Sequence, residues 1–140
     1  MTLESNFDVG VSHIPFAKLL GLEIVSVDKD SVVGQLTVRE ELTTGAGIMH
    51  GGAIMSFADT LGALGTLANL SEGTATTTIE SKTNFTARIL IGDTVRGECT
   101  ALHLGRSTMV WQTRIIRGDG RVGAVVTQTQ LVMQSNTGTS

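Results

Sequence analysis

The chain has 140 residues, of which 41% are hydrophobic and 16% charged, and its formal net charge is −3 at pH 7. We expect one domain over residues 1–140, because a chain of this length buries about two thirds of its unfolded surface. The ten basic residues are scattered, which excludes the basic stripe of a nucleic-acid-binding protein. The polar ends, about 1–12 and 135–140, are expected to fray.

The compartment is indicated by the N-terminus and by the single cysteine. The N-terminus carries acids where a signal peptide needs a basic end, so we expect a cytoplasmic protein. Cys99 has no partner for an internal disulfide and is expected to be a small core residue. We expect no membrane span, because Asp59, His50 and many glycines interrupt the longest apolar stretch, whereas a span needs about 20 mainly apolar residues.

The first half of the chain predicts a short helix, two strands and a long helix. "SHIPFAKLLGLEI" predicts the short helix, with Pro15 in its first turn and Gly21 at its end. "LEIVSVD" and "SVVGQLTVRE" predict strands around a tight turn at Lys29 and Asp30. The segment from about Gly52 to Asn69 predicts a long helix that is apolar nearly all round and therefore buried.

The second half predicts four strands, in "TATTTIESKTNF", "DTVRGECTALHL", "STMVWQTRII" and "RVGAVVTQTQLVM". The last two flank "RGDGR", whose Asp-Gly pair signals a hairpin. Such runs favour an antiparallel meander. We therefore expect an α+β domain in which a strongly curved antiparallel sheet wraps around the long helix. Trp111 is expected to pack in this sheet rather than to hold a substrate.

The long helix carries a single charge. Asp59 is the only charged residue between Leu42 and Ser71. Aspartate has poor helix propensity away from the first turn, and a buried carboxylate is costly unless it is paired or solvated in a cleft. Two interpretations stay open: a distant Arg or Lys pairs with Asp59, or Asp59 faces a pocket, where it would suit a general base.

The helix is preceded by a histidine and begins at two glycines. Its first N–H groups lack helical partners and lie at the positive end of the helix dipole. Gly51 and Gly52 allow close backbone approach, so they suit an anion or a developing oxyanion, although a simple tight turn is the alternative. The stretch lacks the G-x-G-x-x-G spacing and the lysine of nucleotide-binding loops.

The spacing of these two features predicts a shared site. Gly51 and Asp59 are eight positions apart, which is roughly 12 Å along a helix. A base and an oxyanion donor that act on one carbonyl must both come within about 3 Å of the reacting group. Two antiparallel copies of the helix would meet this condition, so we expect two subunits to share the site.

The chain resembles the hotdog-fold acyl-CoA thioesterases, in particular the phenylacetate-pathway branch, over roughly 14–133. The similarity lies in "FAKLLGLEIV", "GIMHGGAIMSFADT", "TTIESKTNFTARILIGD", "LHLGRS" and "DGRVGAVVTQT". Its most specific element is His-Gly-Gly with an Asp nine positions after the His. The resemblance implies a hotdog fold, a homodimer and often a homotetramer, and hydrolysis of an acyl-CoA to a free acid and CoA. CoA belongs to the substrate, and we expect no other cofactor and no metal.

The resemblance also implies roles for the site residues. Asp59 is expected to be the nucleophile or general base, and the Gly51 N–H is expected to polarise the thioester carbonyl from the other subunit. Thr77 or Thr78 is expected to line the water that attacks, and the alignment leaves both open. Thr44 stands where the family usually has Asn or Gln, and it reaches less far.

Further residues are expected to contact the substrate by resemblance: His50, Gly52, Arg88, Gly105, Arg106 and Ser107. The last three match the segment near the CoA arm, and Arg88 is a candidate phosphate contact. His50 invites a role as general base, but the family pattern favours a local hydrogen bond that shapes the loop. Two alternatives stay open: a non-catalytic acyl-CoA sensor, which would usually lack the carboxylate, and a hotdog dehydratase or hydratase.

Overall fold

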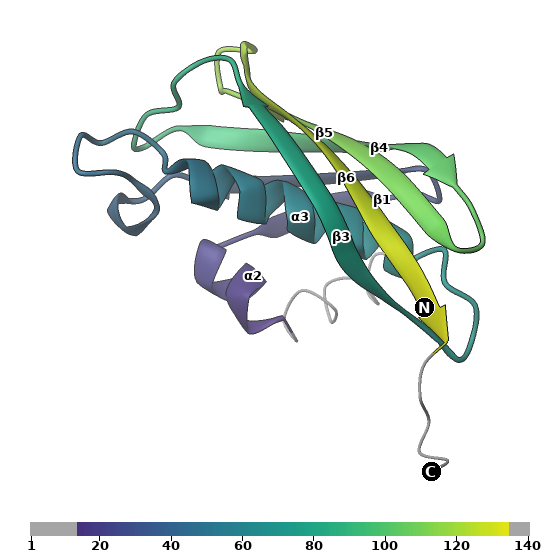
Figure 1. Cartoon of the computed structure of the whole chain (residues 1–140). Helices are drawn as coiled ribbons and strands as arrows, with labels where there is room; N and C mark the ends of the chain where they lie inside the picture. Colours follow the sequence, from purple (N-terminus) through teal and green to yellow (C-terminus); the bar gives the residue numbers. More distant parts are fainter. Residues whose placement is uncertain (1–13, 135–140) are drawn as a thin grey trace.

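A computed structural model describes residues 14–134 and shows one antiparallel sheet curved around a long helix (Figure 1). Its elements in chain order are α2 Pro15–Leu20, β1 Glu23–Val27, β2 Ser31–Thr37, the short 3-10 helix η1 Glu40–Leu42, α3 Gly51–Leu67, β3 Thr74–Phe85, β4 Thr94–Leu104, β5 Thr108–Ile116 and β6 Val122–Gln134. The predicted α+β architecture is confirmed. The prediction that the ends fray concerns residues that lie outside the described range.

The short helix α2 begins and ends where the sequence predicts. Pro15 occupies its first turn, and Gly21 ends it in the left-handed conformation, with φ at 76°. The guanidinium of Arg39 then donates hydrogen bonds to the main-chain oxygens of Leu20, at 3.0 Å, and Leu19. These bonds satisfy carbonyls that the helix end leaves free and tie α2 to the segment after β2.

The strand order is β1-β2-β4-β5-β6-β3. The expected meander is confirmed for β4, β5 and β6, but it is wrong for β3, which pairs with β6 and not with β4. The reason is the connection over residues 86–93, which crosses to the β2 side. Leu90 forms a β-bridge with Ile48, and the Val38 N–H donates to the Asp93 carbonyl at 2.8 Å. Figure 1 shows β3 beside β6, on the side of the sheet away from β1.

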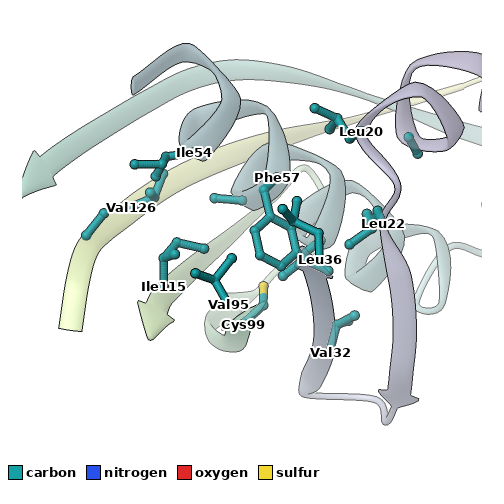
Figure 2. Close-up of a cluster of buried hydrophobic side chains, with 14 of the residues drawn as sticks. Leu20, Leu22, Val32, Leu36, Ile54, Phe57, Val95, Cys99, Ile115 and Val126 are labelled. Carbon is teal, nitrogen blue, oxygen red and sulfur yellow. The ribbon is translucent and has the colours of Figure 1, made fainter. Parts of the chain in front are cut away.

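The core lies between α3 and the concave face of the sheet. Figure 2 shows Phe57 of the helix among side chains of several strands, and this residue is fully buried. Helix and sheet approach closely because glycines lie at the contacts: a Cβ on Gly97 would be 2.6 Å from Leu61, and one on Gly65 would be 2.6 Å from Trp111. Trp111 is thus part of the sheet packing, as predicted.

Of the helices within residues 14–134, none combines the length and the apolar character that crossing a bilayer requires. The long helix was expected from about Gly52 to Asn69, and it runs from Gly51 to Leu67. The two ends therefore differ from the prediction by one and two residues.

Cys99 is 1% exposed, and burial raises the pKa of its thiol to about 11. At pH 8 the native protein therefore holds about a hundredfold less thiolate than a free cysteine, and the sulfur is shielded as well. We expect iodoacetamide to label Cys99 slowly in the native protein and completely after denaturation, as measured by mass spectrometry. Native labelling as fast as that of the denatured chain would contradict this burial.

Candidate active site

Asp59 lies in the middle of α3, half-buried, facing β3 and β6. Its Oδ1 accepts hydrogen bonds from the Thr78 hydroxyl at 2.7 Å and from Gln128 Nε2 at 3.2 Å. Within residues 14–134 no Lys, Arg or His lies at ion-pair distance from this carboxylate. Of the two interpretations of Asp59, the ion pair with a distant Arg or Lys is therefore wrong for the described residues. Two neutral side chains donate to the carboxylate instead.

The alternation of side chains along β3 decides which threonine contacts Asp59. The β3–β6 register shifts between Thr78 and Glu80, at Ile79. Thr78 is half-buried and bonds to Asp59, whereas Thr77 is exposed and pairs with Leu131 on the neighbouring strand. The structure thus brings Thr78, and not Thr77, to the carboxylate.

Two glutamines of β6 complete the surroundings of Asp59. Gln130 Nε2 donates to the Thr78 hydroxyl at 2.6 Å, and Gln130 Oε1 accepts from the Thr76 hydroxyl at 2.9 Å. Gln128 and Gln130 are 1% and 0% exposed. Sequence reasoning missed both, although "TQTQ" places two glutamines on the inward face of an otherwise apolar strand. Such buried amides need hydrogen-bond partners, and this requirement was the available signal.

The start of α3 leaves one N–H free. The Gly52 N–H donates to Nδ1 of His50 at 2.8 Å, so His50 acts as the N-cap and its ring is engaged locally, as the family pattern favours. The Gly51 N–H has no acceptor among the described residues. A cavity of about 420 Å³ opens beside Gly51, and its wall includes Phe85 and Arg88.

The other predicted residues lie away from Asp59 in the single chain. Thr44 is in the loop before α3, where its hydroxyl accepts from the Ala46 N–H at 3.3 Å. Residues 105–107 form the β4–β5 turn, and Arg106 lines a cavity of about 560 Å³ beyond the C-terminal end of α3. Arg88 and Arg106 therefore lie at opposite ends of the helix. Within residues 14–134 no group of three or more His, Cys, Asp or Glu side chains is arranged to hold a metal.

The family model for the thioesterase superfamily matches residues 46–124, from the loop before α3 to the beginning of β6. The chain belongs to the thioesterase superfamily. It is a thioester hydrolase with the hotdog fold, as the His-Gly-Gly and Asp spacing indicated. The matched range includes Gly51, Asp59 and Thr78 but ends before Gln128 and Gln130.

Individual relatives agree with this assignment. This thioesterase is 32% identical to a 1,4-dihydroxy-2-naphthoyl-CoA hydrolase of Listeria monocytogenes. The alignment spans 96 residues, which are 69% of this chain and 77% of the relative. The chain is also 32% identical over 100 residues to the acyl-coenzyme A thioesterase PaaI of Escherichia coli, covering 71% and 69%. The crystal structure of thioesterase HI1161 from Haemophilus influenzae superposes with a TM-score of 0.86 at 25% identity, covering 96% of this chain and 92% of that one.

The geometry around His50 predicts a role in stability. His50→Ala removes the cap on the Gly52 N–H, so we expect it to destabilise the thioesterase by about 1 kcal/mol and to lower Tm by a few degrees. His50→Asn retains a capping side chain and is expected to keep most of the stability. Both variants should retain kcat per folded molecule, measured by CoA release beside thermal melts. An Asn variant with a normal Tm and a lost kcat would instead make His50 a proton-transfer group.

Proposed function

We propose that this thioesterase hydrolyses an acyl- or aryl-CoA thioester to a free acid and CoA, with Asp59 as nucleophile or general base. The observation that carries the proposal is the state of the Asp59 carboxylate. It lies on a buried helix, its hydrogen-bond donors are neutral, and its Oδ2 accepts no bond from a described residue. A carboxylate held in this way can accept a proton or attack a carbonyl. The names of the two relatives support a CoA thioester as the substrate class.

Either role of Asp59 gives a balanced reaction. As a general base, Asp59 takes a proton from water while the water oxygen bonds to the thioester carbonyl carbon; the C–S bond then breaks and the proton passes to the CoA sulfur. As a nucleophile, Asp59 bonds to that carbon itself, CoA thiolate leaves, and water hydrolyses the resulting anhydride. Both routes place negative charge on the carbonyl oxygen, where the free Gly51 N–H is the candidate donor.

We further propose that a homodimer forms the complete site. Along one helix Gly51 and Asp59 are roughly 12 Å apart, too far to serve one carbonyl. Within the described residues the outer edge of the 12-residue strand β3 pairs with no other strand. This strand runs past both features, because Thr78 bonds to Asp59 and Phe85 lies against Gly51. A second copy that pairs antiparallel along this edge would bring its Gly51 toward Asp59.

The same arrangement accounts for the two arginines. Arg88 lies near the N-terminal end of α3 and Arg106 beyond its C-terminal end. In an antiparallel pair, Arg88 of one copy comes to the side where Arg106 of the other lies, so that both cations can contact the phosphates of one CoA. Thr44 and the turn at residues 105–107 would approach the substrate from opposite copies in the same way. A dimer of such dimers and a cytoplasmic location remain predictions from the sequence.

The function is tested with a panel of alkyl- and aryl-CoA thioesters and a thiol-detecting dye. We expect the wild type to release CoA from at least one member and Asp59→Asn to lower kcat by about 10²–10⁴-fold, since the amide neither accepts a proton nor attacks. Its Tm should change little, because the amide retains the size of the carboxyl and an acceptor oxygen for Thr78.

Asp28→Asn, an exposed aspartate before the β1–β2 turn, is the matched control and should keep full activity. A wild type that releases no CoA from any thioester would overturn the proposed function. An Asp59→Asn protein with normal turnover would overturn the role of Asp59 alone.

The shared site is tested by complementation between two inactive variants. Asp59→Asn removes the carboxylate. Gly51→Val obstructs the oxyanion position, since even the Cβ of a side chain at residue 51 would lie 3.1 Å from the Phe85 ring. Co-refolding equal amounts should restore about a quarter of the wild-type activity, because half of the dimers are mixed and each has one intact site of two. Each variant refolded alone is the control. If mass spectrometry finds mixed dimers without activity, the site lies within one chain.

A further inference from the structure

Gln130 and Asp59 together hold the Thr78 hydroxyl in one orientation, because a carboxylate oxygen only accepts and an amide N–H only donates. The Thr76 hydroxyl donates to Gln130 Oε1 at 2.9 Å, which turns the amide nitrogen of Gln130 toward Thr78, at 2.6 Å. An amide N–H can only donate, so the Thr78 oxygen must accept this bond. Its single proton is then left for Asp59 Oδ1, at 2.7 Å. Gln130 is fully buried, so no water competes for its amide.

Gln128 fixes the Asp59 side chain relative to its own backbone. Its Nε2 lies 3.2 Å from Asp59 Oδ1 and 3.3 Å from the main-chain oxygen of the same residue. A donor that binds both oxygens restricts the rotation of the side chain between them. Together with Thr78 it gives Oδ1 two donors, whereas Oδ2 has none among the described residues.

Gly62 makes room for the Gln128 amide. A Cβ at position 62 would lie 2.3 Å from Gln128 Cδ and 2.4 Å from Nε2, which is closer than real atoms approach. Glycine inside a helix is less favourable than alanine by about 1 kcal/mol. The helix is therefore less stable with Gly62 than it would be with alanine, and the glycine leaves the space in which Gln128 reaches Asp59.

The Gln128 amide is also costly in itself. Its Oε1 is buried and has no partner within residues 14–134, and an unsatisfied buried polar atom costs about 1–3 kcal/mol. Core packing alone would favour leucine or methionine, which have a similar size and no polar atom to satisfy. Both the glutamine and the glycine thus oppose stability, and both serve one contact: Gln128 bonds to Asp59, and Gly62 makes room for the Gln128 amide.

We propose that Gln128, Gln130 and Gly62 are positioning residues of the active site, which commit Oδ1 of Asp59 to two donors and leave Oδ2 as the oxygen that reacts. This inference rests on the proposed role of Asp59. The three residues contact neither arginine proposed to hold CoA, so their loss lowers kcat and leaves KM nearly unchanged.

The first test compares Gln128→Leu with Gln112→Leu. Gln112 is a half-buried glutamine of β5 outside the Asp59 network, so its replacement controls for the general loss of a glutamine from the sheet. We expect Gln128→Leu to lower kcat about tenfold to a hundredfold, the usual effect of a bond to a charged group. KM should change less than twofold, and Gln112→Leu should retain the wild-type kcat. A wild-type kcat in Gln128→Leu, or an equal loss in the control, overturns the proposal.

The second test separates positioning from stability. Gly62→Ala should displace the amide and lower both Tm and kcat. Adding Gln128→Ala to it relieves the clash, so Tm should recover while kcat stays low. If kcat recovers together with Tm, Gln128 and Gly62 serve the fold only, and the proposal fails.

The third test needs no turnover. The side-chain amide protons of Gln128, assigned in ¹H–¹⁵N NMR spectra by their absence in Gln128→Leu, should be protected from exchange and should shift in Asp59→Ala. The Gln112 amide serves as the control and should not move. If the chemical shifts of the Gln128 side-chain amide are the same in Asp59→Ala as in the wild type, the positioning role is overturned even in an active enzyme. A signal that responds, in a protein that releases no CoA, supports the contact and overturns the proposed function instead.

Discussion

A carboxylate on a buried helix needs donors, and the helix itself offers none to Asp59. In this molecule the sheet supplies them. Thr78 reaches Asp59 from β3 and Gln128 from β6, so these two strands must lie side by side and face the same part of α3. The strand order and the polar residues on the concave face are both consistent with this one requirement. The rest of the core is free to be apolar, and the close contacts at glycines show that it is also tightly packed.

The two halves of the site are held in different ways. Asp59 is held by the half-buried hydroxyl of Thr78 and the buried amide of Gln128, so its position is determined by the fold. Gly51 lies at the beginning of the helix, next to an open cavity and to the half-exposed ring of Phe85, which is 55% exposed. The chain thus presents a carboxylate held rigidly by the sheet and an accessible N–H group. In a dimer each accessible N–H group would face the rigid group of the other copy.

What the sequence predicted was local. The ends of the short helix could be predicted at Pro15 and Gly21 because their backbone preferences act within one turn. The long helix could be predicted because its apolar residues continue almost without interruption. The lone charge at Asp59 stood out for the same reason. The choice between Thr77 and Thr78 was not local. It depends on the register of β3 with β6, which places Thr78 opposite Gln130 on the face toward α3. The bulge at Ile79 reverses the alternation of side chains only after both threonines.

The errors and omissions have a common physical origin in pairing between distant segments. The meander failed at β3 because the connection over residues 86–93 crosses to β2, and a short loop by itself does not reveal a crossing. Gln128 and Gln130 were missed because their partners are more than 50 positions away in the chain. The family signature could not supply them either, since the matched range ends before them.

The pairing of β3 with β6 has a consequence for synthesis. β3 is made early, but its partner β6 is the last strand that the structure describes, so the ribosome produces β4 and β5 before β3 finds a neighbour. During that interval the strand has two unpaired edges and carries the exposed apolar side chains of Ile79 and Phe85. Unpaired edges of this kind promote association between chains. The nascent chain is therefore most vulnerable to misassembly just before β6 emerges, and the same step completes the surroundings of Asp59.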